Sequence, residues 1–153
     1  MSTVVLKYGG SSVSSVEKMK ALAQRILQRR DAGMDVVVVV SAMGKTTNHL
    51  FELAHEASSS PSKREIDLLL STGEQVSISL FSMILNDMGY PAIGLTGIQA
   101  GIKTKGLHTR NTIEDIDVSR IQKHLSEGKI VLVAGFQGVN ALGDITTLGR
   151  GGS

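Results

Sequence analysis

Five consecutive valines at positions 36–40 constrain the fold of this chain more than any other feature of its sequence. β-branched residues favour strands, and side chains alternate between the two faces of a strand. A strand that is apolar at every position must therefore be covered on both faces, which is typical of a central strand in a parallel sheet. The apolar run from Ile130 to Ala134 predicts a second buried strand of the same kind.

Helical patterns alternate with these strands. After a short strand at Val4–Leu6, apolar residues recur at helical spacing at Val16, Met19, Ala23, Ile26 and Leu27. Further helices are expected over residues 46–57, over 65–86 with a possible interruption at 71–73, and around 118–125, with a short strand at 91–95. Residues 96–108 are expected to form an irregular excursion. This alternation predicts a three-layer α/β sandwich with a mostly parallel central sheet.

Composition excludes several classes of protein. With 153 residues, 41% of them hydrophobic, the chain can bury the core of one domain. A net charge of +2 and an aromatic content of 3% argue against a nucleic-acid partner. No uninterrupted apolar run approaches the roughly 20 residues of a membrane span. The absence of cysteine excludes disulfides and thiolate metal sites, so we expect a cytoplasmic globular protein.

Three polar, glycine-bearing segments follow expected strands, at residues 9–12, 41–47 and 135–138. Open α/β sheets bind ligands at the carboxyl ends of their strands, so these segments are expected to converge on one site. Gly9 and Gly10 would let the backbone approach an anion closely, and Lys7 could neutralise a phosphate. The alternative is a tight strand-to-helix turn with a solvated lysine.

Other segments carry weaker signals. Gly44, Lys45 and Thr46 do not form a P-loop, because the pattern requires a glycine where Val39 stands. Glu74 lies in an apolar helical region, where it is either a solvated carboxylate on the helix surface or a functional carboxylate that orients a substrate ammonium or a loop. The four histidines show no metal-ligand spacing and are interpreted as surface or partly packed residues.

Five motifs, in order along the chain, are similar to the signatures of the amino-acid-kinase family and, within it, of the aspartokinases. They are Lys7 to Ser12, Ser41 to Gly44 with Thr47 and Asn48, Gly73 with Glu74, Ala134 to Gly138, and Thr147 to Ser153. One such motif would be a weak signal, but five in the family's order and at similar spacing are specific. The resemblance covers essentially the whole chain.

The resemblance implies a reaction in which the γ-phosphoryl group of ATP, accompanied by Mg²⁺, passes to the side-chain carboxylate of aspartate. It implies that Lys7 stabilises the transferred group and that the ATP phosphates are bound by Lys7, Tyr8, Gly9 and Gly10. The implied aspartate pocket consists of Ser41, Thr47, Glu74, Phe136, Arg150 and Ser153, with no metal ligand among the side chains. Arg150 can bind a carboxylate bidentately and Glu74 can bind the ammonium group. Catalysis would then depend on positioning and electrostatics.

The resemblance also implies that residues 1–153 are the N-terminal, substrate-binding part of a kinase domain. In the family an aspartate directly follows the serine matched by Ser153, then comes the half that holds the nucleotide, and regulatory ACT domains usually follow. We therefore expect a truncated sandwich that is inactive alone and binds ATP weakly. The parent protein is expected to be a homo-oligomer or to pair with a regulatory subunit in the first step of lysine, threonine and methionine synthesis.

Two alternatives remain open at the level of the sequence. The first is another amino-acid kinase, acting on acetylglutamate, glutamate, carbamate or uridylate. The second is a non-catalytic binding or oligomerisation module. Substrate screening separates the first from an aspartokinase, and ATP binding separates the second.

Overall fold

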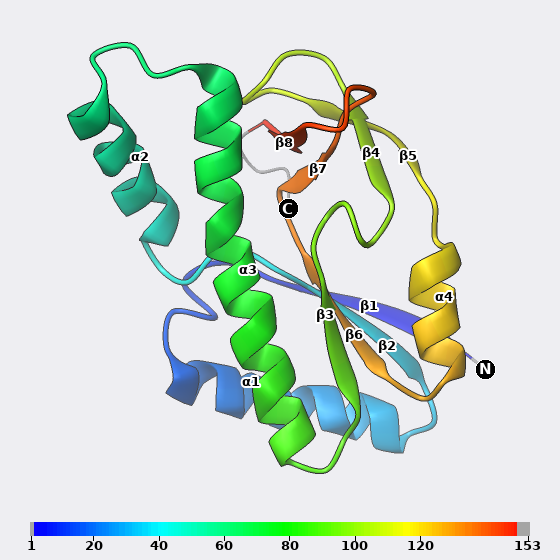
Figure 1. The fold of residues 1–153 in the computed structure, drawn as a ribbon. Coiled ribbons are helices and arrows are strands. Elements are labelled where there is room, and N and C mark those ends of the chain that lie inside the picture. The colour runs from blue at the N-terminus through cyan, green and yellow to red at the C-terminus, as the bar shows by residue number, and fades with distance from the viewer. Residues whose placement is uncertain (1, 150–153) are drawn as a thin grey trace.

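The computed structural model describes residues 2–149, and a four-stranded parallel sheet lies at its centre (Figure 1). Its strands, in spatial order, are β1 (Thr3–Tyr8), β2 (Asp35–Val40), β6 (Ile130–Ala134) and β3 (Ala92–Leu95). The two apolar runs are thus the two inner strands, paired in a register that places Val38 beside Leu132. This confirms the sequence prediction, because only inner strands can bury every side chain on both faces.

Helices cover both faces of this sheet, which gives the three layers expected from the sequence. Helices α1 (Val16–Asp31) and α3 (Lys63–Asp87) contribute to one apolar cluster, which also contains the even-numbered valines of β2. The short helix α4 (Ser119–Ser126) packs Leu125 on the opposite face, against Val37, Val131 and Val133. Helix α2 (Thr46–Ala57) packs against the first half of α3 rather than on the sheet.

Helix α3 is the central helix of the fold. It is continuous, so the possible interruption at residues 71–73 is wrong. Gly73 lets α3 approach Ala42, in the loop after β2, closely, because a Cβ atom at position 73 would lie 2.8 Å from the Cβ atom of Ala42. By length and composition alone α3 could cross a membrane, but more than half of its most apolar stretch is buried inside the molecule. It therefore behaves as a core helix.

A second, smaller sheet stands beside the carboxyl ends of the central strands (Figure 1). Its strands, in spatial order, are β5 (Thr112–Ile116), β4 (Ile102–Lys105), β7 (Gln137–Val139) and β8 (Ile145–Thr147). The expectation of an irregular excursion over residues 96–108 was therefore wrong. Strands this short carry no periodic signal, and the partner of β4 on one side, β7, is more than thirty residues away in sequence.

Candidate functional site

A cavity of about 790 Å³ opens at the carboxyl ends of β1, β2 and β6, beside α3. All three polar segments singled out in the sequence contribute to its lining. The lining residues are Gly10, Ser41, Ala42, Gly44, Thr47, Asn48, Phe51, Leu70, Glu74, Thr109, Arg110, Phe136, Thr147 and Leu148. The convergence expected from parallel-sheet topology is thus confirmed.

The loops after β1 and β2 are joined to one another at the edge of the cavity. The Gly44 amide donates to the Gly10 carbonyl at 2.9 Å, and the Ser41 amide donates to the Tyr8 carbonyl at 3.2 Å. A Cβ atom at Gly10 would lie 3.0 Å from the carbonyl oxygens of Ala42 and Gly44, which is too close for an ordinary contact. Gly10 therefore permits the close approach of the two loops, whereas a Cβ atom at Gly9 would meet no atom of residues 2–149 within 4 Å.

Glu74 places a buried carboxylate in the wall of this cavity. Its side chain is 1% exposed, and its Oε1 accepts a hydrogen bond of 3.0 Å from Nε2 of Gln137. Burial raises the pKa of Glu74 to about 7, although hydrogen bonds from Gln137 and the Ala42 backbone favour the ionised form. A cationic group entering the cavity would stabilise the ionised carboxylate, so Glu74 suits a ligand ammonium.

Gln137 fixes the orientation of Glu74, and sequence reasoning did not identify it as a site residue. Its Nε2 also donates to the Ser71 carbonyl at 3.0 Å, while its Oε1 accepts from the Gly97 amide at 3.1 Å. The side chain is 3% exposed and is held at both ends. The sequence did offer one indication that Gln137 belongs to the site, since it lies within the motif from Ala134 to Gly138.

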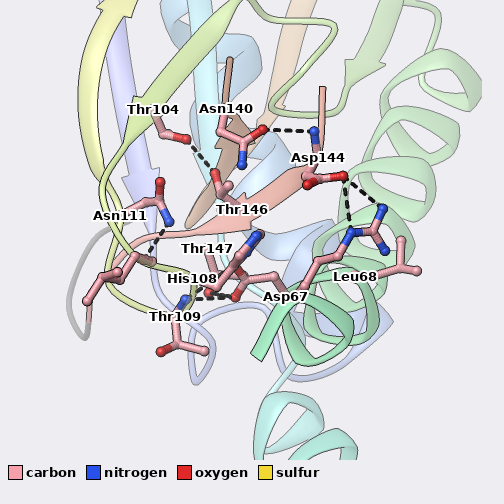
Figure 2. Close-up of polar contacts among 12 residues, drawn as sticks. Asp67, Leu68, Thr104, His108, Thr109, Asn111, Asn140, Asp144, Thr146 and Thr147 are labelled. Carbon is pink, nitrogen blue, oxygen red and sulfur yellow. Dashed lines mark hydrogen bonds and ion pairs between the residues drawn. The ribbon is translucent and has the colours of Figure 1, made fainter. Parts of the chain in front are cut away.

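A second polar cluster anchors the loop between β4 and β5 to α3 (Figure 2). Its centre is the carboxylate of Asp67, which is completely buried. This carboxylate lies 2.5 Å from Nδ1 of His108 and accepts from the Thr147 hydroxyl at 2.6 Å. It also accepts from the Thr109 amide, at 3.1 and 3.2 Å for its two oxygens. The partly packed His108 expected from the sequence is found, but the role of Asp67 was missed.

Two residues that line the cavity have a left-handed backbone. Thr109 has a φ of 68° and Phe136 a φ of 70°, a conformation that costs energy for any residue with a side chain. Such strain persists only where the surroundings hold it, and it clusters at functional sites. For Thr109 the hydrogen bonds to Asp67 provide that constraint.

The structure brings most, but not all, of the residues expected at the site to one cavity. Ser41, Thr47, Glu74 and Phe136 line it together with Gly10. Lys7 and Tyr8 lie on β1 just before it, with Lys7 exposed and Tyr8 packed against the apolar cluster on the opposite face. Arg150 and Ser153 lie outside the described residues.

Sequence reasoning missed the contribution of the β4–β5 loop, which supplies Thr109 and Arg110 to the lining. No local signal could have found them, since the loop reaches the cavity through the long-range contact with Asp67. Among residues 2–149, no group of three or more histidine, aspartate or glutamate side chains is placed to hold a metal ion.

Comparisons with known proteins agree with this geometry. A model of the amino acid kinase family matches residues 2–153. The chain is 57% identical to an aspartokinase of Geobacillus stearothermophilus and 55% identical to aspartokinase 2 of Bacillus subtilis, over its full length in both cases. It spans only about 38% of the length of each of these relatives.

Solved structures give the same result. A crystal structure of aspartate kinase from Synechocystis superposes with a TM-score of 0.82 at 48% identity, covering 99% of this chain and 24% of that one. Escherichia coli aspartokinase III in complex with aspartate and ADP superposes with a TM-score of 0.80 at 25% identity, covering 99% of this chain and 44% of that one.

Proposed function

This chain belongs to the amino acid kinase family, and we propose that it forms the aspartate-binding part of an aspartokinase. The observation that carries the proposal is the cavity, which gathers Gly10, Ser41, Thr47, Glu74 and Phe136 from three loops and two helices. The relatives named aspartokinase support the choice of reaction, and the complex of the Escherichia coli enzyme with aspartate and ADP supports the choice of ligands.

In this proposal Glu74 binds the ammonium group of aspartate. Burial raises the pKa of this carboxylate and so disfavours its ionised form, and a cationic partner would stabilise that ionised form. Glu74 need not act as a base, because the side-chain carboxylate of aspartate is already ionised at neutral pH. One oxygen of the aspartate side-chain carboxylate forms a bond to the γ-phosphorus of ATP. The bond from that phosphorus to the β–γ bridging oxygen breaks, and ADP leaves. The product is an acyl phosphate.

Lys7 and the glycines after β1 would act on the phosphates. Lys7 is exposed on β1, three residues before Gly10, where it can reach a phosphoryl group presented at the end of the strand. The backbone amides of Gly9 and Gly10 would donate to phosphate oxygens, as glycine-bearing turns before helices do in other anion sites. Ser41, Thr47 and Phe136 would complete the aspartate pocket. Arg150 and Ser153 are proposed for the same pocket on the strength of the family resemblance alone.

Several further features belong to the same proposal. Residues 2–149 contain no group of three or more acidic or histidine side chains placed to hold a metal ion, and Mg²⁺ is proposed to arrive bound to ATP. The protein is proposed to act in the cytoplasm, as a homo-oligomer or with a regulatory subunit. Because the chain spans about 38% of the relatives' length, we propose that activity requires a longer protein that contains it.

The test is an assay of the full-length gene product with ATP and candidate acceptors. Aspartate should be converted to an acyl phosphate that hydroxylamine traps as aspartyl hydroxamate, with one ADP released per hydroxamate formed. Acetylglutamate, glutamate, carbamate and uridylate serve as competing acceptors. Turnover of any of these in preference to aspartate would overturn the substrate assignment. The 153-residue chain alone should give no hydroxamate above background.

A further inference from the structure

Arg110 brings a positive charge to the cavity that contains Glu74. Within residues 2–149 its guanidinium group makes no hydrogen bond or ion pair with another residue. A guanidinium group carries five donors in a planar arrangement that matches a carboxylate. A charged group that lines a cavity and has no partner in the described part of the chain is available to a ligand.

The backbone on both sides of Arg110 is anchored, so this charge is not simply the end of a loose surface loop. On one side, the Thr109 amide donates to both oxygens of the buried Asp67. On the other side, Asn111 is buried. Its backbone N–H donates to the Thr147 carbonyl at 3.2 Å, and its side-chain Nδ2 donates to the Leu107 carbonyl at 2.6 Å. Anchors at both neighbours reduce the cost of ordering the loop when a ligand binds.

The two charges in the cavity complement an amino acid with an acidic group. Glu74 is negative when ionised and comes from α3, whereas Arg110 is positive and comes from the β4–β5 loop. A ligand with an ammonium group and a carboxylate can pair with both, and neither charge then remains unpaired beside the cavity. A ligand that lacks a carboxylate would leave Arg110 without a partner.

We propose that Arg110 binds a carboxylate of the aspartate substrate, and that Asp67 is a positioning residue that holds the loop carrying Arg110. This inference rests on the proposed function and adds a binding residue to the same pocket. It also accounts for the left-handed backbone of Thr109, since the conformation is held by Asp67 directly before the residue that meets the ligand. The alternative is a solvated Arg110 with Asp67 stabilising the fold only.

The test compares variants of the full-length gene product in the hydroxamate assay. Arg110→Gln should raise the KM for aspartate roughly 10- to 100-fold, because a hydrogen bond to a charged group is lost, while the KM for ATP is unchanged. Arg110→Lys should have a KM for aspartate between those of the wild type and Arg110→Gln, since lysine keeps the charge but lacks the planar pair of donors. The matched control is Arg120→Gln, which makes the same change at an exposed position on α4 and should leave every parameter at the wild-type value.

Asp67 is tested through its dependence on Arg110. Asp67→Asn should raise the KM for aspartate in the wild-type background but not in the Arg110→Gln background, because both changes remove the same interaction. A purely structural role would instead lower the melting temperature equally in both backgrounds without this dependence in KM.

The possible failures are distinguishable. A wild-type KM for aspartate in Arg110→Gln, in an enzyme that does phosphorylate aspartate, would overturn this inference and leave the proposed function standing. Effects of the two substitutions that simply multiply would overturn the positioning role of Asp67. A wild-type gene product that does not phosphorylate aspartate would overturn the proposed function, and this inference with it.

Discussion

Replacing Glu74 with glutamine should make the protein more stable at alkaline pH while having little effect at acid pH. Glutamine keeps the shape of the side chain and an oxygen that can accept the hydrogen bond from Gln137, which is 3.0 Å long in the wild type. It removes the cost of holding a negative charge at a position that is 1% exposed. The size of that cost follows from the pKa.

Burial raises the pKa of Glu74 from an ordinary 4.5 to about 7 in the folded protein. The folded state then holds this proton more tightly than the unfolded state, so the free energy of unfolding falls as pH rises from about 4.5 to about 7 and levels off above that. At about 1.4 kcal/mol for each pKa unit, the loss is on the order of 3 kcal/mol. Glu74→Gln lacks this titration, so its advantage should grow across the same range.

Urea unfolding of the wild type and Glu74→Gln, followed by far-ultraviolet circular dichroism at several pH values from 4 to 8.5, measures this difference. Other carboxylates, such as the half-buried Asp144, whose pKa is lowered by its contact with Arg64, titrate in both proteins, and their contributions cancel when the two stabilities are subtracted. A difference that does not change with pH, or a variant that is less stable than the wild type at pH 8, would refute the argument that burial dominates the ionisation of Glu74.

Three further predictions follow from the same geometry. Lys7→Ala in the full-length protein should lower kcat about a hundredfold, and by more than it raises the KM for aspartate, because the role proposed for Lys7 is to stabilise the moving phosphoryl group. An unchanged kcat in the hydroxamate assay would contradict that role. The KM for aspartate should rise roughly tenfold for each pH unit below about 7, since the ammonium pairs with ionised Glu74, and a flat profile from pH 5.5 to 8 would contradict that pairing. Gly97→Ala should cost about 1–3 kcal/mol in urea unfolding, because its Cβ atom would lie 2.7 Å from the carbonyl carbon of Gln137. The control is Gly149→Ala, whose Cβ atom would meet no atom of residues 2–149 within 4 Å and which should cost far less.

Several elements of the fold could be predicted from the sequence because their signals are local. The runs at 36–40 and 130–134 became the inner strands, since an all-apolar strand has no stable place at an edge or on a surface. Of the five apolar positions predicted to form one face of α1, four are buried, namely Met19, Ala23, Ile26 and Leu27, whereas Val16, the first residue of the helix, is exposed. The convergence of three loops also followed, because the direction of parallel strands sends their carboxyl ends to one edge.

The cavity's chemistry depends on pairs of residues that are distant in sequence. Glu74 and Gln137 are 63 positions apart, and Asp67 and Thr147 are 80 positions apart. No pattern along the chain specifies such a pair, because a hydrogen bond between remote side chains requires the backbone to be placed first. The second sheet was hidden for a related reason: its strands of three to five residues are too short to show a periodic pattern, and its two halves, β4 with β5 and β7 with β8, are joined only by the distant pairing of Lys103 with Val139.

By itself, the sequence determined the layers of this protein, the edge of the sheet at which a ligand would bind and, through its motifs, the family it resembles. The tertiary structure decided which charged side chains line the cavity at that edge. It buried Glu74 and so raised its pKa, and it held the loop of Arg110 in place through Asp67. The physical reason is that hydrophobic periodicity is a property of residues close together in the sequence, whereas desolvation and long-range hydrogen bonding arise only once the whole chain has packed.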